Sequence, residues 1–139
     1  MQIKHDIYHT MLYRINLILN SEKSVRMHEL SIALGIVKIA EAETAKANAK
    51  EVERIELEIG ELAGVEIDSL DFVWDTAVKD SVLEKAEKHI NIIKGIGKCI
   101  DCYTEFEMHY IYDTCPNCNS NLKSILKGKE LRVKTLDVI

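Results

Sequence analysis

The chain of 139 residues is 47% hydrophobic and 29% charged, with six glycines and one proline. These values are typical of a globular protein and exclude a fibrous or linker-dominated chain. The length corresponds to one domain, with room for a small additional module. No apolar run approaches the ~18 residues that a membrane helix needs, because charged residues interrupt each candidate. We therefore exclude a membrane-spanning protein.

The net charge of −5 is unevenly distributed along the chain. Residues 1–26 hold four basic and two acidic side chains, so the other 113 residues hold 14 basic and 21 acidic ones. A surface with that balance repels phosphate backbones unless its basic groups cluster strongly. We expect neither nucleic acid nor a membrane as a partner.

Residues 1–26 form an N-terminal extension that differs in character from the rest of the chain. Its apolar residues recur every three or four positions, which predicts an amphipathic surface helix. A signal peptide is disfavoured because Arg14 and Asn16 interrupt the apolar stretch and no small-residue cleavage site follows. The alternative interpretation is that translation begins at Met27 and the extension reflects a wrongly assigned start site.

The segment after Met27 alternates between helical and strand patterns. A long Ala-rich helix is predicted over His28–Ala49, where apolar residues fall mostly on one stripe. Strict alternation predicts a half-buried strand over 55–59, ended by Gly60. A second helix follows, with Asp68 as its predicted N-cap and its apolar residues at 70–78.

The last part of the chain predicts two more strands around a cysteine module. One strand covers Ile90–Ile93 and is ended by Gly95 and Gly97, and the other begins near Leu131. This order predicts an α+β fold, with two helices packed on a small three-stranded sheet and a module inserted before the last strand. The predicted organisation is an extension (1–26), an α+β lobe (27–96 and 129–139) and an inserted lobe (97–128).

The strongest chemical signal is a pair of CxxC motifs, Cys99–Cys102 and Cys115–Cys118, which use every cysteine in the chain. Two thiolates at this spacing on a tight turn can face one ion, and two such turns complete a tetrahedron. Residues 105–112 alternate between apolar and polar side chains and predict a strand of the intervening ribbon. The motifs therefore predict a four-thiolate zinc ribbon.

Other occupants of these cysteines are possible. Two disulfides are the first alternative, but nothing in the sequence indicates secretion. Iron in a rubredoxin-like site is the main competitor of zinc, since tetrahedral sulfur suits both ions. Four thiolates leave no open coordination position, so the ion is expected to be structural rather than hydrolytic.

No catalytic constellation accompanies the cysteines. The chain has no spare cysteine, HExxH motif, phosphate-binding glycine loop or GxSxG motif, and an enzyme is not expected. His89 and His109 are interpreted as residues on solvated strand faces. The spacing of His5 and His9 could clamp a metal on a helix, but two isolated ligands are weak evidence.

The order of motifs from Met27 onward resembles the HypA/HybF family, the nickel metallochaperones of [NiFe]-hydrogenase maturation. The resemblance rests on Met27-His28-Glu29-Leu30 at the head of a long helix, the strand 55–62, the segment 67–74 and the two CxxC pairs. It implies zinc at Cys99, Cys102, Cys115 and Cys118 and nickel at Met27, His28 and Glu29. Tyr103 and Asn119 stand where family members commonly have glycine, which leaves the zinc assignment intact because Asn tolerates left-handed backbone angles.

The resemblance further implies a cytoplasmic carrier that is a monomer or homodimer. Its expected partners are the GTPase HypB and the hydrogenase large-subunit precursor, to which Ni²⁺ is delivered as cargo. A zinc-ribbon adaptor and a rubredoxin-like iron electron carrier are the alternative functions, which the cysteine module alone does not exclude.

The chemistry of the Met-His-Glu head agrees with a nickel site. Ni(II) with strong nitrogen donors adopts a square plane, and imidazole suits it. A free α-amine on Met27, the backbone amides of His28 and Glu29 and the His28 imidazole are the candidate donors. In the chain as written Met27 is internal, so the amine is absent, and nickel binding should weaken or change geometry if the extension is present.

Overall fold

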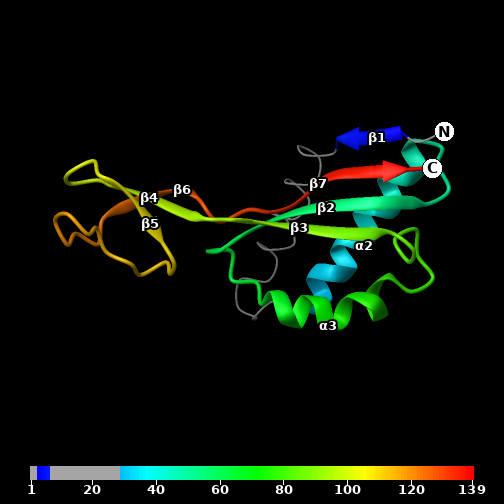
Figure 1. Cartoon of the computed structure of the whole chain (residues 1–139), viewed down its shortest axis with the longest axis horizontal. Coiled ribbons are helices and arrows are strands. Elements are labelled where there is room, and N and C mark those ends of the chain that lie inside the picture. Colours follow the sequence, from blue (N-terminus) through cyan, green and yellow to red (C-terminus); the bar gives the residue numbers. More distant parts are fainter. Residues whose placement is uncertain (1–2, 7–28) are drawn as a thin grey trace. The chain divides into compact units, whose positions relative to one another are not determined.

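The computed structural model describes residues 29–139 and the backbone of residues 3–6. Within these residues the chain forms two helices, α2 (Glu29–Lys46) and α3 (Ile67–Val78), together with seven strands (Figure 1). The strands are β1 (Ile3–Asp6), β2 (Val52–Gly60), β3 (Glu87–Ile93), β4 (Gly95–Cys99), β5 (Glu105–Met108), β6 (Lys123–Lys127) and β7 (Leu131–Val138). Neither α2 nor α3 is long and apolar enough to cross a membrane.

The chain divides into two compact units, each with its own buried core. The helical unit comprises the described residues up to Leu57, together with Glu66–Ile90 and Arg132–Ile139. The cysteine unit comprises Glu58–Val65 and Asn91–Leu131. Each unit is therefore assembled from segments that are distant in the sequence.

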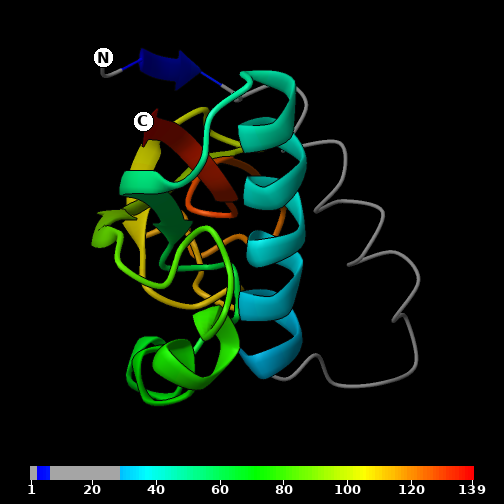
Figure 2. The same ribbon diagram turned by 90° about the vertical axis from the view of Figure 1, so that its right-hand side faces the viewer.

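The helical unit combines both helices with a sheet whose strand order is β1-β7-β2-β3. Figure 2 shows α2 beside this sheet, with α3 near the end at which α2 begins. The core forms where apolar side chains of both element types meet, and α2 supplies Ile32, Ile36 and Ile39. Strand β2 alternates as predicted and buries Ile55 and Leu57 on the same core. The predicted α+β fold with two helices is confirmed.

The sheet contains one strand more than predicted, because Ile3–Asp6 is extended. This strand, β1, pairs antiparallel with β7, in a register that runs from Ile3 opposite Val138 to Asp6 opposite Thr135. The prediction of an amphipathic helix is wrong for these four residues, where pairing with an available strand edge overrides the helical pattern. The rest of the predicted extension, residues 7–26, lies outside the described residues.

The helix α3 begins earlier than predicted. Its N-cap is Glu66, whose side chain makes no capping bond, and Ile67 is the first helical residue. Asp68 is therefore wrong as the N-cap and lies in the first turn instead, where a carboxylate is still favoured by the helix dipole.

The cysteine unit contains a second sheet with the strand order β5-β4-β6. The predicted strand does end at Ile93, the last residue of β3, but Gly95 and Gly97 lie within a further strand, β4, that was not predicted. A Cβ atom on Gly97 would lie 2.5 Å from the Met108 sulfur, and one on Gly95 would meet the Met108 carbonyl oxygen. Glycine is thus required at both positions because β5 approaches β4 closely. The local sequence pattern does not indicate this approach.

The predicted strand over 105–112 is correct only up to Met108. Beyond it the chain turns, because the Asp113 carboxylate accepts the backbone N–H groups of His109 and Tyr110 at 2.8 and 3.1 Å. The alternation at Tyr110 and Tyr112 continues without a strand, and these two exposed rings stack with centroids 5.1 Å apart. In residues 109–112 the alternation of apolar and polar side chains therefore arises from a turn with two stacked tyrosine rings, and not from a strand.

Candidate metal centre

The structure brings the four cysteines of the two CxxC motifs together in the cysteine unit. Their sulfur atoms all lie within 4.8 Å of one another. The sulfurs of Cys99 and Cys118 are 3.5 Å apart, and those of Cys102 and Cys115 are 3.6 Å apart. All four thiols are free, so the two-disulfide alternative is not realised.

The two motifs fold into the same tight turn. The N–H of Tyr103 bonds the Cys99 carbonyl at 3.1 Å, and the N–H of Asn119 bonds the Cys115 carbonyl at 2.8 Å. Tyr103 and Asn119 have φ angles of 62° and 60°, so both adopt the left-handed conformation. At both positions the family resemblance implies glycine, which adopts this conformation without strain. An L-residue other than Asn is conformationally strained at such a φ angle. Tyr103 adopts this conformation in the turn that its N–H closes by bonding the Cys99 carbonyl.

The sulfurs differ in burial and in hydrogen bonding. Cys99 and Cys115 are buried, whereas Cys118 is exposed. The Cys102 sulfur lies 3.2 Å from the Thr104 hydroxyl and 3.5 Å from the Asn117 amide nitrogen. Bonds from Thr104 and then Asn117 stabilise the Cys102 thiolate and lower its pKa to about 5.

Cys118 behaves in the opposite way. The backbone N–H of Ser120 acts to lower the pKa of its thiol, but bonds to the other three thiols and desolvation outweigh this and raise the pKa to about 12. Without a metal, the Cys102 sulfur is therefore mostly a thiolate at neutral pH, whereas the Cys118 sulfur keeps its proton. A cation at the centre would displace the remaining protons.

The donor set fits a tetrahedral thiophilic ion. A Zn–S distance of ~2.3 Å corresponds to sulfurs ~3.8 Å apart, close to the Cys99–Cys118 and Cys102–Cys115 separations of 3.5 and 3.6 Å. Among the described residues this is the single group of three or more histidine, cysteine or carboxylate side chains that could hold a metal. Sulfur fills every position, so the site can hold an ion without exposing it for hydrolysis.

The supporting core of this site includes a residue that sequence analysis did not identify. Leu62, from the segment after β2, is buried together with Phe106 and Met108 against Cys99 and Cys115. Its N–H also bonds the Gly128 carbonyl at 2.7 Å. The site is thus anchored by a segment that lies 37 residues before the first cysteine, a distance at which no local motif gives a signal.

The predicted nickel residues are only partly within the described chain. Glu29 is the first residue of α2, and its carboxylate Oε1 accepts the backbone N–H of Glu66 at 3.1 Å. Met27 and His28 lie outside the described residues. The structure therefore places Glu29 beside the start of α3, well separated in the sequence from the cysteines.

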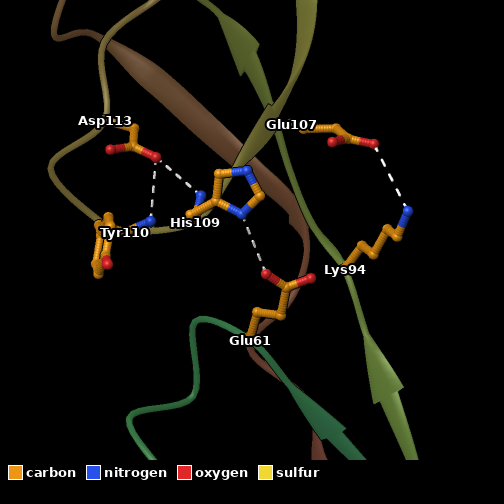
Figure 3. A network of polar contacts seen from close by, with 6 residues as sticks. All are labelled: Glu61, Lys94, Glu107, His109, Tyr110 and Asp113. Carbon is orange, nitrogen blue, oxygen red and sulfur yellow. Dashed lines mark hydrogen bonds and ion pairs between the residues drawn. The ribbon is translucent and has the colours of Figure 1, made fainter.

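The remaining histidines take no part in the cysteine cluster. His89 is exposed on β3, as expected. Nδ1 of the exposed His109 lies 3.4 Å from a carboxylate oxygen of Glu61 (Figure 3). The backbone bonds from His109 and Tyr110 lower the pKa of Asp113. His109 therefore belongs to a polar network, while the His5 side chain and His9 are outside the described residues.

Comparison with known proteins identifies relatives along most of the chain. The family model described as "Hydrogenase/urease nickel incorporation, metallochaperone, hypA" matches residues 27–138. The hydrogenase maturation factor HypA of Parabacteroides distasonis is 52% identical over 110 residues, covering 79% of this chain and 96% of the relative. HypA of Francisella philomiragia is 44% identical, with 79% and 97% covered.

Solved structures agree with the sequence relatives. The solution structure of the Ni metallochaperone HypA from Helicobacter pylori aligns with a TM-score of 0.61 and 27% identity. The alignment covers 81% of this chain and 98% of that chain.

Proposed function

The chain belongs to the HypA family of hydrogenase/urease nickel-incorporation metallochaperones. We propose which of its residues hold a structural metal ion and which bind the nickel that it carries. It acts as a nickel metallochaperone in hydrogenase maturation and is not an enzyme. The zinc-ribbon adaptor and the rubredoxin-like electron carrier are not favoured, because the match spans both units and not the cysteine module alone.

We propose that Cys99, Cys102, Cys115 and Cys118 hold a structural Zn²⁺. The observation that carries this proposal is the convergence of four free sulfurs with no open position. Bound zinc would supply folding free energy to a unit with a small apolar core and would leave the ion unavailable for transfer. We propose that residues 97–128 form the zinc-binding lobe.

We propose that the cargo nickel binds at the head of α2, through Met27, His28 and Glu29. Family membership and the order of donors along the chain support this assignment. A site built on a short run of backbone and one imidazole has no cage of side chains, so it should release its ion readily. We propose that residues 27–96 and 129–139 form the nickel-binding lobe.

We infer that the partners are the GTPase HypB and the hydrogenase large-subunit precursor, in the cytoplasm. Four thiolates require reduced cysteines, which supports that compartment. The helical unit also presents apolar side chains suited to a protein partner. Leu34 is 50% exposed and Phe72 is 87% exposed, on α2 and α3 respectively.

The partner proposal predicts a complex that depends on Phe72. Phe72→Ala should weaken binding to the cognate GTPase about tenfold, since an exposed aromatic side chain that becomes buried in a complex is a typical binding hot spot. Leu126→Ala is the matched control, because Leu126 is 47% exposed on β6 of the cysteine unit. Gel filtration and calorimetry of zinc-loaded protein, with and without nickel, measure the complex. Absence of a complex under both conditions would contradict the partner assignment.

A further inference from the structure

Strand β7 would form the edge of the sheet in the helical unit if β1 did not pair with it. The strand order is β1-β7-β2-β3, so β7 pairs with β2 on one side and with β1 on the other (Figure 1). An unpaired strand edge presents a row of N–H and C=O groups, and these groups can pair with another chain. The β7 edge is therefore a strand-addition site, and β1 occupies it.

β1 covers only the half of β7 that lacks basic residues. Its four residues lie antiparallel to residues 135–138. This half of β7 contains the buried side chains of Leu136 and Val138 and no lysine or arginine. The other half contains Arg132 and Lys134, and basic residues on an edge strand are a common protection against pairing with other chains. The half without this protection is thus the half that β1 covers.

The register of β1 on β7 brings residues of opposite charge to one position. Lys4 lies opposite Asp137. One carboxylate oxygen of Asp137 is buried and has no hydrogen-bond partner among the described residues. A positively charged residue directly opposite a carboxylate favours the pairing of two strands. The sequence of β1 therefore suits this edge.

β1 belongs to a part of the chain that the family match does not include. The family model matches residues 27–138, a range that contains β7 and not β1. β1 is short, and three of its four residues are Lys4, His5 and Asp6. Short strands with charged residues are poor templates for a further strand. Pairing with β1 therefore replaces a partly apolar edge with a short polar one.

We propose that β1 is an intrachain cover of the β7 edge, and that an uncovered β7 edge pairs with the β7 edge of a second copy of this chain. A two-fold axis places two identical edge strands antiparallel, which is the direction that β1 adopts on this edge. A pairing centred on residues 135–138 keeps the basic residues Arg132 and Lys134 of the two copies at opposite ends of the contact. This inference does not depend on the nickel site.

The test compares two double variants of the full zinc-loaded chain by analytical ultracentrifugation. Lys4→Pro/His5→Pro removes two consecutive N–H groups, and one of them faces β7 because N–H groups alternate in direction along a strand. This variant should dimerise at least about tenfold more tightly than the unmodified chain, because the cover no longer lowers the fraction of open edges. Lys4→Arg/His5→Ala is the matched control, since it keeps both N–H groups and the positive charge opposite Asp137. The control should have the dimer dissociation constant of the unmodified chain.

Asp137→Lys, added to the proline variant, tests which surface forms the dimer. It places a lysine in the unprotected half of β7 and should abolish the dimer. Far-ultraviolet circular dichroism and zinc content check that each variant is folded.

Three results would overturn this inference. A folded proline variant that dimerises no more tightly than the unmodified chain would show that β1 covers nothing. Equal tightening in Lys4→Arg/His5→Ala would assign the effect to the side chains of β1 and not to its strand pairing. A dimer that persists after Asp137→Lys would place the contact on another surface.

Discussion

Replacing Cys115 with Ser should release zinc and unfold the cysteine unit. Cys115 is fully buried among Leu62, Phe106 and Met108, so its loss removes a metal ligand and leaves a hydroxyl in an apolar core. Structural zinc contributes about 10 to 16 kcal/mol to folding in zinc-finger peptides, far more than this small core can replace. Zinc content by mass spectrometry and near-ultraviolet circular dichroism measure the effect.

Asn117→Ala is the matched control for this experiment. Asn117 lies inside the same CxxC turn, and its amide donates to the Cys102 sulfur at 3.5 Å without being a ligand. The variant should keep one zinc per chain and a folded cysteine unit, with faster zinc loss to a chelator. A Cys115→Ser protein that retained stoichiometric zinc and its fold would exclude the four-thiolate site.

His28→Ala, in a chain that begins at Met27, should abolish stoichiometric nickel binding and leave zinc content and fold intact. The family model matches residues 27–138, so a chain that begins at Met27 keeps the whole matched region. His28 supplies the single imidazole of the Met-His-Glu head, whereas the cysteine site already has its four ligands. Calorimetric titration with Ni(II) measures the loss.

The 139-residue chain is the reference for the role of the α-amine. With Met27 inside the backbone one nitrogen donor is missing, and we expect weaker binding or six-coordinate nickel in place of a square plane. The visible spectrum of bound nickel distinguishes these geometries. Identical spectra and affinities in the two chains would show that the amine is not a ligand, and full binding by His28→Ala would remove the basis of the nickel assignment.

The convergence of the cysteines could be predicted from the sequence because each CxxC turn is a local structure. The left-handed residues Tyr103 and Asn119 follow the second cysteine of each motif and make the same backbone bond. When two turns of the same geometry are joined by one ribbon of strands, their four cysteine sulfurs can face one another. The arrangement of four sulfurs therefore follows from spacing that is visible in the sequence.

The errors arose where contacts between distant residues decide local structure. The sequence pattern predicts a turn at Gly95 and Gly97, whereas both lie in β4 with Met108 packed against them. Leu62 likewise joins the cysteine core from the segment after β2. The bond between Glu29 and Glu66 has the same character. Periodicity and turn chemistry carry no information about such pairs.

Native mass spectrometry of the zinc-loaded protein during titration with Ni(II) tests the central claim, that structural metal and cargo metal occupy separate sites. We expect one zinc per chain before titration and one zinc plus one nickel afterwards, with the zinc count unchanged at nickel saturation. Loss of one zinc for each nickel bound would show that the two ions compete for the cysteine site and would contradict separate sites. Iron in place of zinc, or a chain that takes up no nickel, would contradict the metal assignments.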